Sequence, residues 1–387
     1  MEYSKPSVRG SLNSVEALPV TPEEITATWC SKILGRQIQN VTIAHIIHGT
    51  ATKLLLDITD TSPPGDPSSK TQRRRICLKG GFDPQLRAQY PGLNATYRRE
   101  AEFYYHIAPA ASPSLRLPRV WYCGSDTVTG QGVVALADLA ADGCAFGNPV
   151  TPWPVDRARA GVAQLAALHA RTWDATVERF PWLAGGIEAN PCRAIVRELL
   201  GPAAWARRFA EGERPPVPPH LADRTRMVAA FEALWRSADA GSGSGVRLRC
   251  VVHGDAHLGN TFVTAAGEPG FLDWQGVHLG SPFHDVAYFV TGALGTADRR
   301  RHEGELVERY LDELARLGGP RLAREEVWDE YRKHVLHGFV WALPTPQMQA
   351  RENVFAMAER HAAAIVDHGS LELLEGLPEY EAPGRDC

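Results

Sequence analysis

The sequence predicts an α+β protein built as two lobes, and three observations lead to this prediction. The chain has 387 residues, which is long for one ordinary domain and comfortable for two. Short alternating segments dominate residues 21–139, whereas helical periodicity dominates after residue 154. A strand–turn–strand segment within Val251–Asp285 presents an acidic residue at each end. We therefore expect a small N-terminal lobe of antiparallel sheet with one main helix, followed by a larger, mostly helical lobe that contains this hairpin.

The composition argues against several classes of protein. Hydrophobic residues make up 44% of the chain and charged residues 22%, as in ordinary globular proteins. A net charge of −4 argues against a general nucleic-acid binder, which usually has a basic face. The seven cysteines form no CxxC pair, which disfavours a disulfide framework or structural zinc site. No signal-peptide core and no membrane-length run of roughly 18 apolar residues is visible, so we expect a cytoplasmic protein.

The N-terminal lobe is expected over 21–139, after a loose leader over 1–20. Thr21, Pro22 and Glu24 form a capping-box pattern that predicts a helix ending at Gly35. A polar insertion over 60–74 is expected to form a surface loop. The main helix is expected over 94–107. The predicted strands of this lobe cover residues 41–47, 51–58, 75–79, 120–123 and 132–137.

Several residues of this lobe are candidates for contacts with a nucleotide. The turn at Gly49 and Thr50 could cover phosphates closely, because Gly49 has no Cβ, although an ordinary tight hairpin explains it equally well. Lys79 ends a strand, and a lysine that holds phosphates needs a carboxylate to fix its ammonium group. Glu100 is the preferred partner and Glu102 the second choice; the two lie on different faces of the helix.

The two lobes are expected to join over 140–153, where prolines and glycines are frequent. Backbone groups between Ala137 and Leu139 could pair with the edge of a purine. The C-terminal lobe is then expected over 154–387. Its predicted helices cover residues 160–173, 184–217 in broken form, 220–239, 286–292, 303–317, 324–342 and 347–367. His169 on the first of these is interpreted as a core histidine with a backbone partner.

The most informative stretch contains His253-Gly254-Asp255-Ala256-His257-Leu258-Gly259-Asn260, followed by Phe271-Leu272-Asp273-Trp274-Gln275. Asp255 precedes Asn260 by five positions, the spacing of the Asp and Asn in a kinase catalytic loop. In that loop the Asp accepts the proton of the attacking hydroxyl and the Asn holds a metal. Asp273 then stands where a kinase places its main magnesium ligand. The sequence therefore predicts a phosphoryl-transfer site.

Two other interpretations of this stretch were weighed. Asp, Asn and Gly are common turn residues, so the first motif alone could be a plain loop. The second acidic motif, with Lys79 and Glu100 upstream in the right order, disfavours that interpretation. His253 and His257 could also bind a metal with the acidic residues, as in a hydrolase. The flanking glycines indicate a loop, however, and no Glu follows the first His as in HExxH.

These residues resemble the aminoglycoside-phosphotransferase and choline-kinase-like superfamily of small-molecule kinases, whose signature reads His-Gly-Asp-x-x-x-x-Asn followed by an Ile/Leu-Asp-Phe/Trp metal motif. The ecdysteroid-kinase-like branch is the most similar. Its features recur as Arg99-Glu100 before Phe103-Tyr104, Leu168-His169-Ala170 near Trp173, Leu272-Asp273-Trp274-Gln275, and Asp285-Val286-Ala287-Tyr288. The resemblance covers roughly residues 21–370 and implies a bilobal, protein-kinase-like fold.

The resemblance also implies roles for individual residues. Asp255 would accept the proton of the acceptor hydroxyl, while Asn260 and Asp273 would hold Mg²⁺. Lys79, fixed by Glu100, would support the phosphates of ATP. The remaining polar residues would support the loop: His253 and His257 by hydrogen bonds within it, and Asp285 by accepting its backbone N–H groups.

The function expected is transfer of the γ-phosphate of ATP to a hydroxyl of a small molecule. Two alternatives stay open: a nucleotide-binding scaffold without turnover, and an atypical protein kinase. The latter is disfavoured because few residues separate Asp273 from Asp285, which leaves little room for a peptide-docking segment. The C-terminal helices mix charges and contain the apolar run His337–Leu343, so a mixed or lipophilic alcohol is favoured over a polyamine as acceptor.

Overall fold

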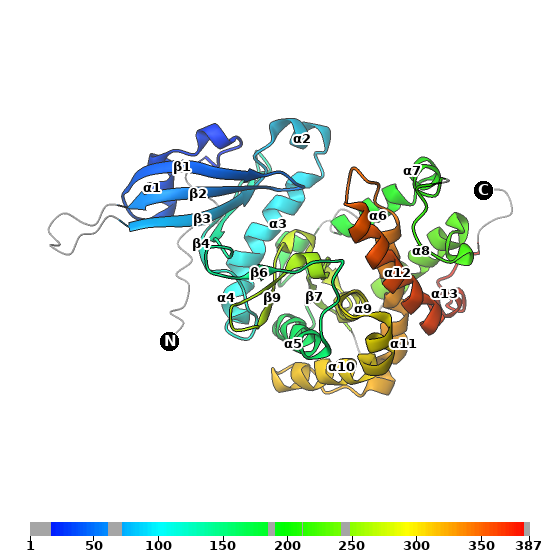
Figure 1. Cartoon of the computed structure of the whole chain (residues 1–387). Helices are drawn as coiled ribbons and strands as arrows, with labels where there is room; N and C mark the ends of the chain where they lie inside the picture. The colour runs from blue at the N-terminus through cyan, green and yellow to red at the C-terminus, as the bar shows by residue number, and fades with distance from the viewer. Residues whose placement is uncertain (1–16, 61–71, 185–189, 211, 241–247, 383–387) are drawn as a thin grey trace. The chain divides into compact units, whose positions relative to one another are not determined.

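The computed structural model describes residues 17–60, 72–184, 190–210, 212–240 and 248–382. Most of the predicted leader and residues 61–71 of the insertion predicted over 60–74 lie outside these residues. So does the segment Ser242–Gly245, which the sequence predicts as a flexible linker. The chain forms two compact units. The first comprises residues 1–145 and 272–276, and the second comprises 146–271 and 277–387. The predicted α+β class is confirmed, with an antiparallel sheet in the first unit and a mostly helical second unit (Figure 1).

The first unit contains a five-stranded antiparallel sheet with strand order β1-β2-β3-β5-β4. Helix α3 packs against β4 and β5 (Figure 1). Leu54, Leu56, Ile76 and Leu78 alternate inward on β2 and β3 and are fully buried in the core under the sheet. The strands are β1 (Ile38–Ile47), β2 (Thr52–Asp60), β3 (Gln72–Gly80), β4 (Val120–Ser125) and β5 (Gly132–Ala137). The helices are α1 (Ala27–Leu34), α2 (Pro84–Gln89), α3 (Leu93–His106) and α4 (Ala108–Ala111).

The expected helix start at Thr21 is wrong. Pro22–Glu24 forms a separate 3₁₀ turn, η1, and α1 begins only at Ala27, where Thr26 Oγ1 accepts the N–H of Trp29 at 3.1 Å. Ile25 between them is extended and its side chain is buried, so burial of one apolar residue interrupts the local capping pattern. The predicted end is correct: Gly35 has a left-handed backbone with φ of 62°.

The second unit is built mostly from helices, among which α5 packs on α9 and α10, and α9 on α11 (Figure 1). Its helices are α5 (Val155–Arg171), α6 (Pro191–Leu199), α7 (Pro202–Arg208), α8 (Arg224–Ala240), α9 (Pro282–Ala293), α10 (Thr296–Arg316), α11 (Arg324–Val335), α12 (Arg351–His368) and α13 (Ser370–Glu375). The 3₁₀ turns are η2 (Pro181–Leu183), η4 (Pro219–Leu221), η5 (Leu258–Asn260) and η7 (Leu336–Ala342), and η6 (Trp274–Gly276) belongs to the first unit.

Short strands frame the catalytic-loop motif. The predicted hairpin is present as β8 (Thr261–Val263) paired with β9 (Pro269–Phe271). The strand before the motif, β7 (Cys250–Val252), instead pairs with β10 (His278–Gly280), which the sequence analysis did not predict. A two-residue strand, β6 (Ala145–Phe146), lies at the boundary between the units.

The single helix expected over 324–342 is also wrong. The α-helix ends at Val335 and continues as the 3₁₀ turn η7. The ring of His361 packs closely against the bare Cα of Gly338, which leaves no room there for a Cβ. This close approach requires glycine, and glycine weakens the helix. Among the described residues, no helix has both the length and the apolar character needed to cross a membrane.

Candidate active site

Lys79 of the first unit lies between two carboxylates. Its Nζ is 2.8 Å from Oε2 of Glu100 on α3 and 2.8 Å from Oδ1 of Asp273, which follows β9 in the chain. Glu102 lies on another face of α3 and pairs with His106 at 3.2 Å. The helical phase of α3 therefore selects Glu100 and not Glu102 as the partner of Lys79.

Burial and the neighbouring charges shift the pKa of Lys79 in opposite directions. The side chain of Lys79 is only 3% exposed. Burial alone would lower the pKa of Lys79, but the adjacent Asp273 and Glu100 more than offset this and raise it. Burial and the charge of Asp273 raise the pKa of Glu100, against the lowering effect of Lys79. Lys79 is therefore a permanently charged group that two carboxylates hold in place.

The backbone at Asp273 has a conformation that non-glycine residues seldom adopt, with φ of 63°. The next residue, Trp274, is fully buried and stacks on Phe103 of α3, with ring centroids 3.9 Å apart. The N–H of Trp274 also donates to Oε1 of Glu100 at 3.3 Å. These contacts fix the strained segment, and the side chain of Asp273 keeps 28% of its surface exposed.

The other nucleotide candidates occupy the edges of the same unit. Gly49 and Thr50 lie in the exposed turn between β1 and β2, and the carbonyl of Thr50 accepts the Tyr97 hydroxyl at 2.8 Å. Ala137 ends β5, and its N–H donates to the carbonyl of Arg119 at 2.8 Å, so this amide is already engaged. Leu139 follows two residues later. Their contacts with a nucleotide stay predictions.

In the second unit, Asp285 organises the loop from His253 to Asn260. Asp285 lies in the first turn of α9 and is fully buried. It accepts the backbone N–H groups of His253 at 2.6 Å and Gly254 at 2.9 Å. Burial would raise the pKa of Asp285, but the hydrogen bond with His169 and the neighbouring histidines lower it well below its usual range. Gly254 has φ of 82°, a conformation that suits glycine.

Asp255 differs from its surroundings because its side chain is 47% exposed, whereas His253 and Asp285 are fully buried. The Nδ2 group of Asn260 donates to the Oδ2 and backbone oxygen of Asp255, both at 2.9 Å. The Tyr288 hydroxyl donates to Oδ1 at 3.5 Å. Burial raises the pKa of Tyr288, which keeps this hydroxyl protonated. An accessible carboxylate is thus held in one orientation.

Two histidines stabilise the loop through hydrogen bonds to its backbone. Nδ1 of His253 accepts the N–H of Asp255 at 3.2 Å, and Nδ1 of His257 accepts the N–H of Gly259 at 3.0 Å. Nε2 of His257 also lies 3.5 Å from Oδ2 of Asp255. Within the described residues, no group of three or more His, Cys, Asp or Glu side chains is arranged to hold a metal ion, so the histidine-rich hydrolase site considered from the sequence has no counterpart there.

The sequence analysis missed several residues that support this loop. The expectation of a backbone partner for His169 is wrong: its Nε2 contacts Asp285 at 3.1 Å and its Nδ1 contacts the Tyr310 hydroxyl at 3.0 Å. Nε2 of His284 donates to the carbonyl of Gly254 at 3.1 Å. These partners are far apart in the chain, so local periodicity could not pair them. The Leu168-His169-Ala170 motif was the only sequence signal for His169. It marked the histidine but did not indicate that Asp285 and Tyr310 are its hydrogen-bond partners.

The chain matches the model of a known protein family. The model of the phosphotransferase enzyme family (APH) matches residues 86–334, well over half of the chain. The chain belongs to the phosphotransferase enzyme family. It is accordingly an enzyme, a small-molecule kinase, as the sequence analysis predicted. Membership of the ecdysteroid-kinase-like branch stays a prediction. No curated protein is matched by the sequence.

Solved structures of other kinases resemble this member of the phosphotransferase family. A microcompartment-associated aminopropanol kinase has 15% identity and a TM-score of 0.45, with 89% of this chain and 99% of that chain covered. Choline kinase LicA from Streptococcus pneumoniae has 14% identity and a TM-score of 0.45, with coverages of 88% and 97%. A mutant of aminoglycoside phosphotransferase APH(4)-Ia, in a ternary complex with AMP-PNP and hygromycin B, has 15% identity and a TM-score of 0.45, with coverages of 89% and 98%.

Proposed function

We propose that this phosphotransferase moves the γ-phosphoryl group of ATP to a hydroxyl of a small molecule, with Asp255 as the base. The observation that carries the proposal is the state of Asp255, an exposed carboxylate held by Asn260 and Tyr288 in a loop that begins at the buried His253 and Gly254. A base must be accessible to the substrate hydroxyl and fixed in orientation, and Asp255 meets both conditions. It would accept the proton of the hydroxyl as the new O–P bond forms.

Lys79 is proposed to support the α- and β-phosphates of the nucleotide. A phosphate chain carries several negative charges, and a lysine whose pKa is raised is protonated at neutral pH. Glu100 restricts the flexible ammonium group to one position, which lowers the entropy lost on binding. Gly49, Thr50, Ala137 and Leu139 would provide backbone contacts around the nucleotide.

Asn260 and Asp273 fit the role of Mg²⁺ ligands by their chemistry. Mg²⁺ prefers hard oxygen ligands and is commonly held by one or two protein groups together with phosphate oxygens and water. The Nδ2 group of Asn260 donates to Asp255, which leaves the amide oxygen of Asn260 as its ligand atom. Asp273 offers a partly exposed carboxylate. When bound, the ion would offset the negative charge that develops on the transferred phosphoryl group.

The proposal is tested by ADP release in the presence of Mg²⁺-ATP and a panel of alcohols. The variant Asp255→Asn should bind ATP with wild-type affinity by calorimetry and lose turnover by about 10²- to 10⁴-fold, since a general base contributes about that much. Asp312→Asn, which changes an exposed carboxylate on α10, serves as the matched control. Wild-type turnover by Asp255→Asn would exclude Asp255 as the base, and a chain that binds ATP without turning over any alcohol would be the nucleotide-binding scaffold.

A further inference from the structure

The 3₁₀ turn η7 places Trp341 against two side chains that surround Asp255. The indole packs on the ring of His257 edge to face, with centroids 4.9 Å apart. It also shares a buried apolar cluster with Tyr288 of α9 and Met357 of α12. The turn is remote from the loop in the sequence, but all of these residues belong to the second unit. Trp341 therefore supports two neighbours of the proposed base at once.

Tyr288 and His257 face different oxygen atoms of Asp255. The Tyr288 hydroxyl donates to Oδ1 at 3.5 Å, and Nε2 of His257 lies 3.5 Å from Oδ2. Nδ1 of His257 accepts the N–H of Gly259, so the neutral imidazole carries its proton on Nε2, which faces the carboxylate. Both distances are at the upper limit for a hydrogen bond, so a small shift of either ring would end the interaction.

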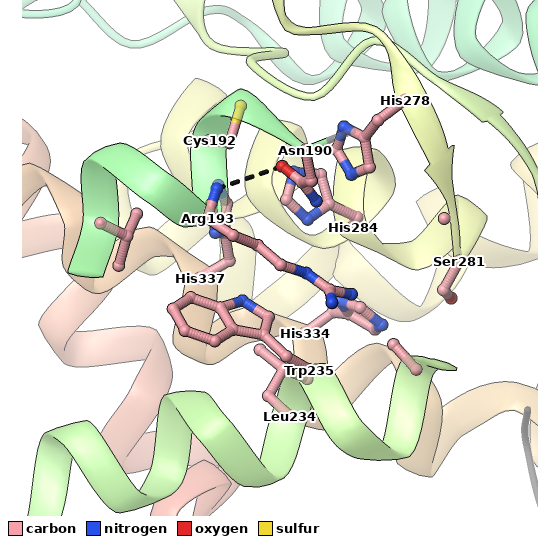
Figure 2. A pocket seen from close by; sticks show the side chains of 13 residues that line it. Asn190, Cys192, Arg193, Leu234, Trp235, His278, Ser281, His284, His334 and His337 are labelled. Carbon is pink, nitrogen blue, oxygen red and sulfur yellow. Dashed lines mark hydrogen bonds between the residues drawn. The ribbon is translucent and has the colours of Figure 1, made fainter. Parts of the chain in front are cut away.

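Another residue of η7 supports the backbone of the same loop. The ring of His337 packs on the ring of His284 with centroids 4.1 Å apart, at the edge of a small pocket (Figure 2). Nε2 of His284 donates to the carbonyl of Gly254, the residue before Asp255. The turn thus lies behind the supports of both the backbone and the side chain of the proposed base.

Trp341 is the side chain that the rings of His257 and Tyr288 share. It is only 5% exposed, so its removal would leave a cavity beside both rings. The Tyr288 ring keeps a second support, because His361 stacks on it with centroids 5.3 Å apart. The His257 ring lies nearer to Trp341 than to Tyr288, whose ring centroid is 6.2 Å away. Loss of Trp341 should therefore release His257 more than Tyr288.

We propose that Trp341 is a positioning residue for phosphoryl transfer, which fixes the carboxylate of Asp255 through His257 and Tyr288. The inference rests on the proposed function, because it concerns the same base. A carboxylate that rotates spends less time in the orientation that accepts the proton, and a misplacement of about 1 Å can cost about a hundredfold in rate. Asn260 donates to Oδ2 at 2.9 Å independently of these two rings, so we expect a smaller, partial loss.

The experiment compares substitutions on one turn. Trp341→Leu removes the ring, and Trp341→Phe keeps a smaller aromatic ring against His257. Phe339→Leu is the matched control, because Phe339 is buried on the same turn but packs its ring on Trp205 and Phe209. ADP release gives kcat and the KM for ATP, with the alcohol that the wild type turns over fastest. Denaturant titration gives the unfolding free energy, and crystal structures give the side-chain positions.

Trp341→Leu should lower kcat about tenfold with the KM for ATP unchanged, and Trp341→Phe should lower kcat about threefold. Phe339→Leu should keep the wild-type kcat although it also destabilises the protein. A purely structural role would reduce the stability of both leucine variants and the kcat of neither. A wild-type kcat in Trp341→Leu, or an equal loss of kcat in Phe339→Leu, would overturn the inference. If Trp341→Leu does not fold, a wild-type kcat in Trp341→Phe overturns it instead.

The crystal structures separate this inference from the proposed function. In Trp341→Leu, Nε2 of His257 should lie further from Oδ2 of Asp255 than in the wild type, whether or not an alcohol is turned over. Unchanged positions of His257, Tyr288 and Asp255 in this variant would overturn the inference. A displaced His257 ring in a protein that turns over no alcohol of the panel would support the positioning of Asp255 by Trp341 and count against phosphoryl transfer.

Discussion

Nε2 of His169 lies 3.1 Å from Oδ2 of Asp285, and both side chains are fully buried. The same carboxylate accepts two backbone N–H groups, from His253 and Gly254, of the loop that carries Asp255. Helix α5 therefore supports the loop through Asp285, because His169 fixes the carboxylate that binds the loop backbone. The loop geometry depends on a contact between helices that begin more than a hundred residues apart in the sequence.

Removal of His169 should destabilise the protein. In His169→Ala, Asp285 loses a buried hydrogen-bond partner, and the free energy of unfolding should fall by about 1–3 kcal/mol, which denaturant titration measures. Tyr310→Phe removes only the hydroxyl that contacts the other ring nitrogen of His169 and should cost less. An unfolding free energy of His169→Ala equal to that of the wild type would show that the pair contributes nothing.

Glu100 and Glu102 offer a matched test on one helix. Glu100→Gln removes the charge that fixes Lys79, so the KM for ATP should rise about tenfold, equivalent to about 1.4 kcal/mol. Glu102→Gln alters a carboxylate that pairs with His106 and not with Lys79, so it should leave the KM for ATP unchanged. Steady-state kinetics with varied ATP concentration measure this KM in both variants. Equal changes in the KM for ATP would show that Glu100 has no special role in nucleotide binding.

Asp273 is expected to carry the magnesium dependence of nucleotide binding. Calorimetry of ATP with Mg²⁺ and with a chelator should give different affinities for the wild-type protein, because the ion links phosphate to the protein. In Asp273→Ala this difference should disappear. Asp57→Ala, which breaks an exposed ion pair with Arg75 in the same unit, should retain it. A magnesium effect in Asp273→Ala as large as in the wild type would contradict the assignment of Asp273 as a ligand.

The buried histidines predict a stability loss in mild acid. Burial lowers the pKa of His284 from 6.5 to about 4, and Asp285 only partly offsets this. Between these values the unfolded chain binds a proton that the folded protein does not, so the free energy of unfolding falls as the pH is lowered from 6.5 towards 4. The loss should be roughly 1.4 kcal/mol per pH unit for each such histidine. His337, whose pKa burial also lowers, adds in the same direction.

Denaturant titrations between pH 5 and 6.5 isolate this effect, because that window lies above the unfolded pKa values of the carboxylates, which are roughly 4. Asp285, whose pKa is depressed, loses its stabilising contribution only at lower pH. His284→Gln should reduce the slope of stability against pH within the window by about one proton. If the unfolding free energy of His284→Gln changes with pH as steeply as that of the wild type, the pKa of His284 is not lowered in the folded protein.

Much of the fold and the candidate site could be predicted from local patterns. Alternation of apolar residues located the sheet strands, such as β2 and β3, because a strand with one buried face must alternate. The spacing of Asp255 and Asn260 identified the loop that is proposed to be catalytic. The helix start at Thr21 was wrong because burial of Ile25 outweighed a capping preference worth only about 1 kcal/mol. The glycine at position 338, just after the α-helix ends at Val335, is required by the ring of His361, a contact that local sequence does not reveal.

The sequence by itself determined which groups are proposed to carry the chemistry, because motif spacing and residue type predict a carboxylate base, two oxygen ligands and a lysine with its partner. The tertiary structure decided how these groups are held. It selected Glu100 over Glu102 as the partner of Lys79, brought His169 into contact with Asp285, and gathered four histidines around a small pocket beside α6 and α8 (Figure 2). The physical reason is that hydrogen bonds, burial and pKa shifts depend on distances between residues remote in the chain, whereas local patterns report only on neighbours.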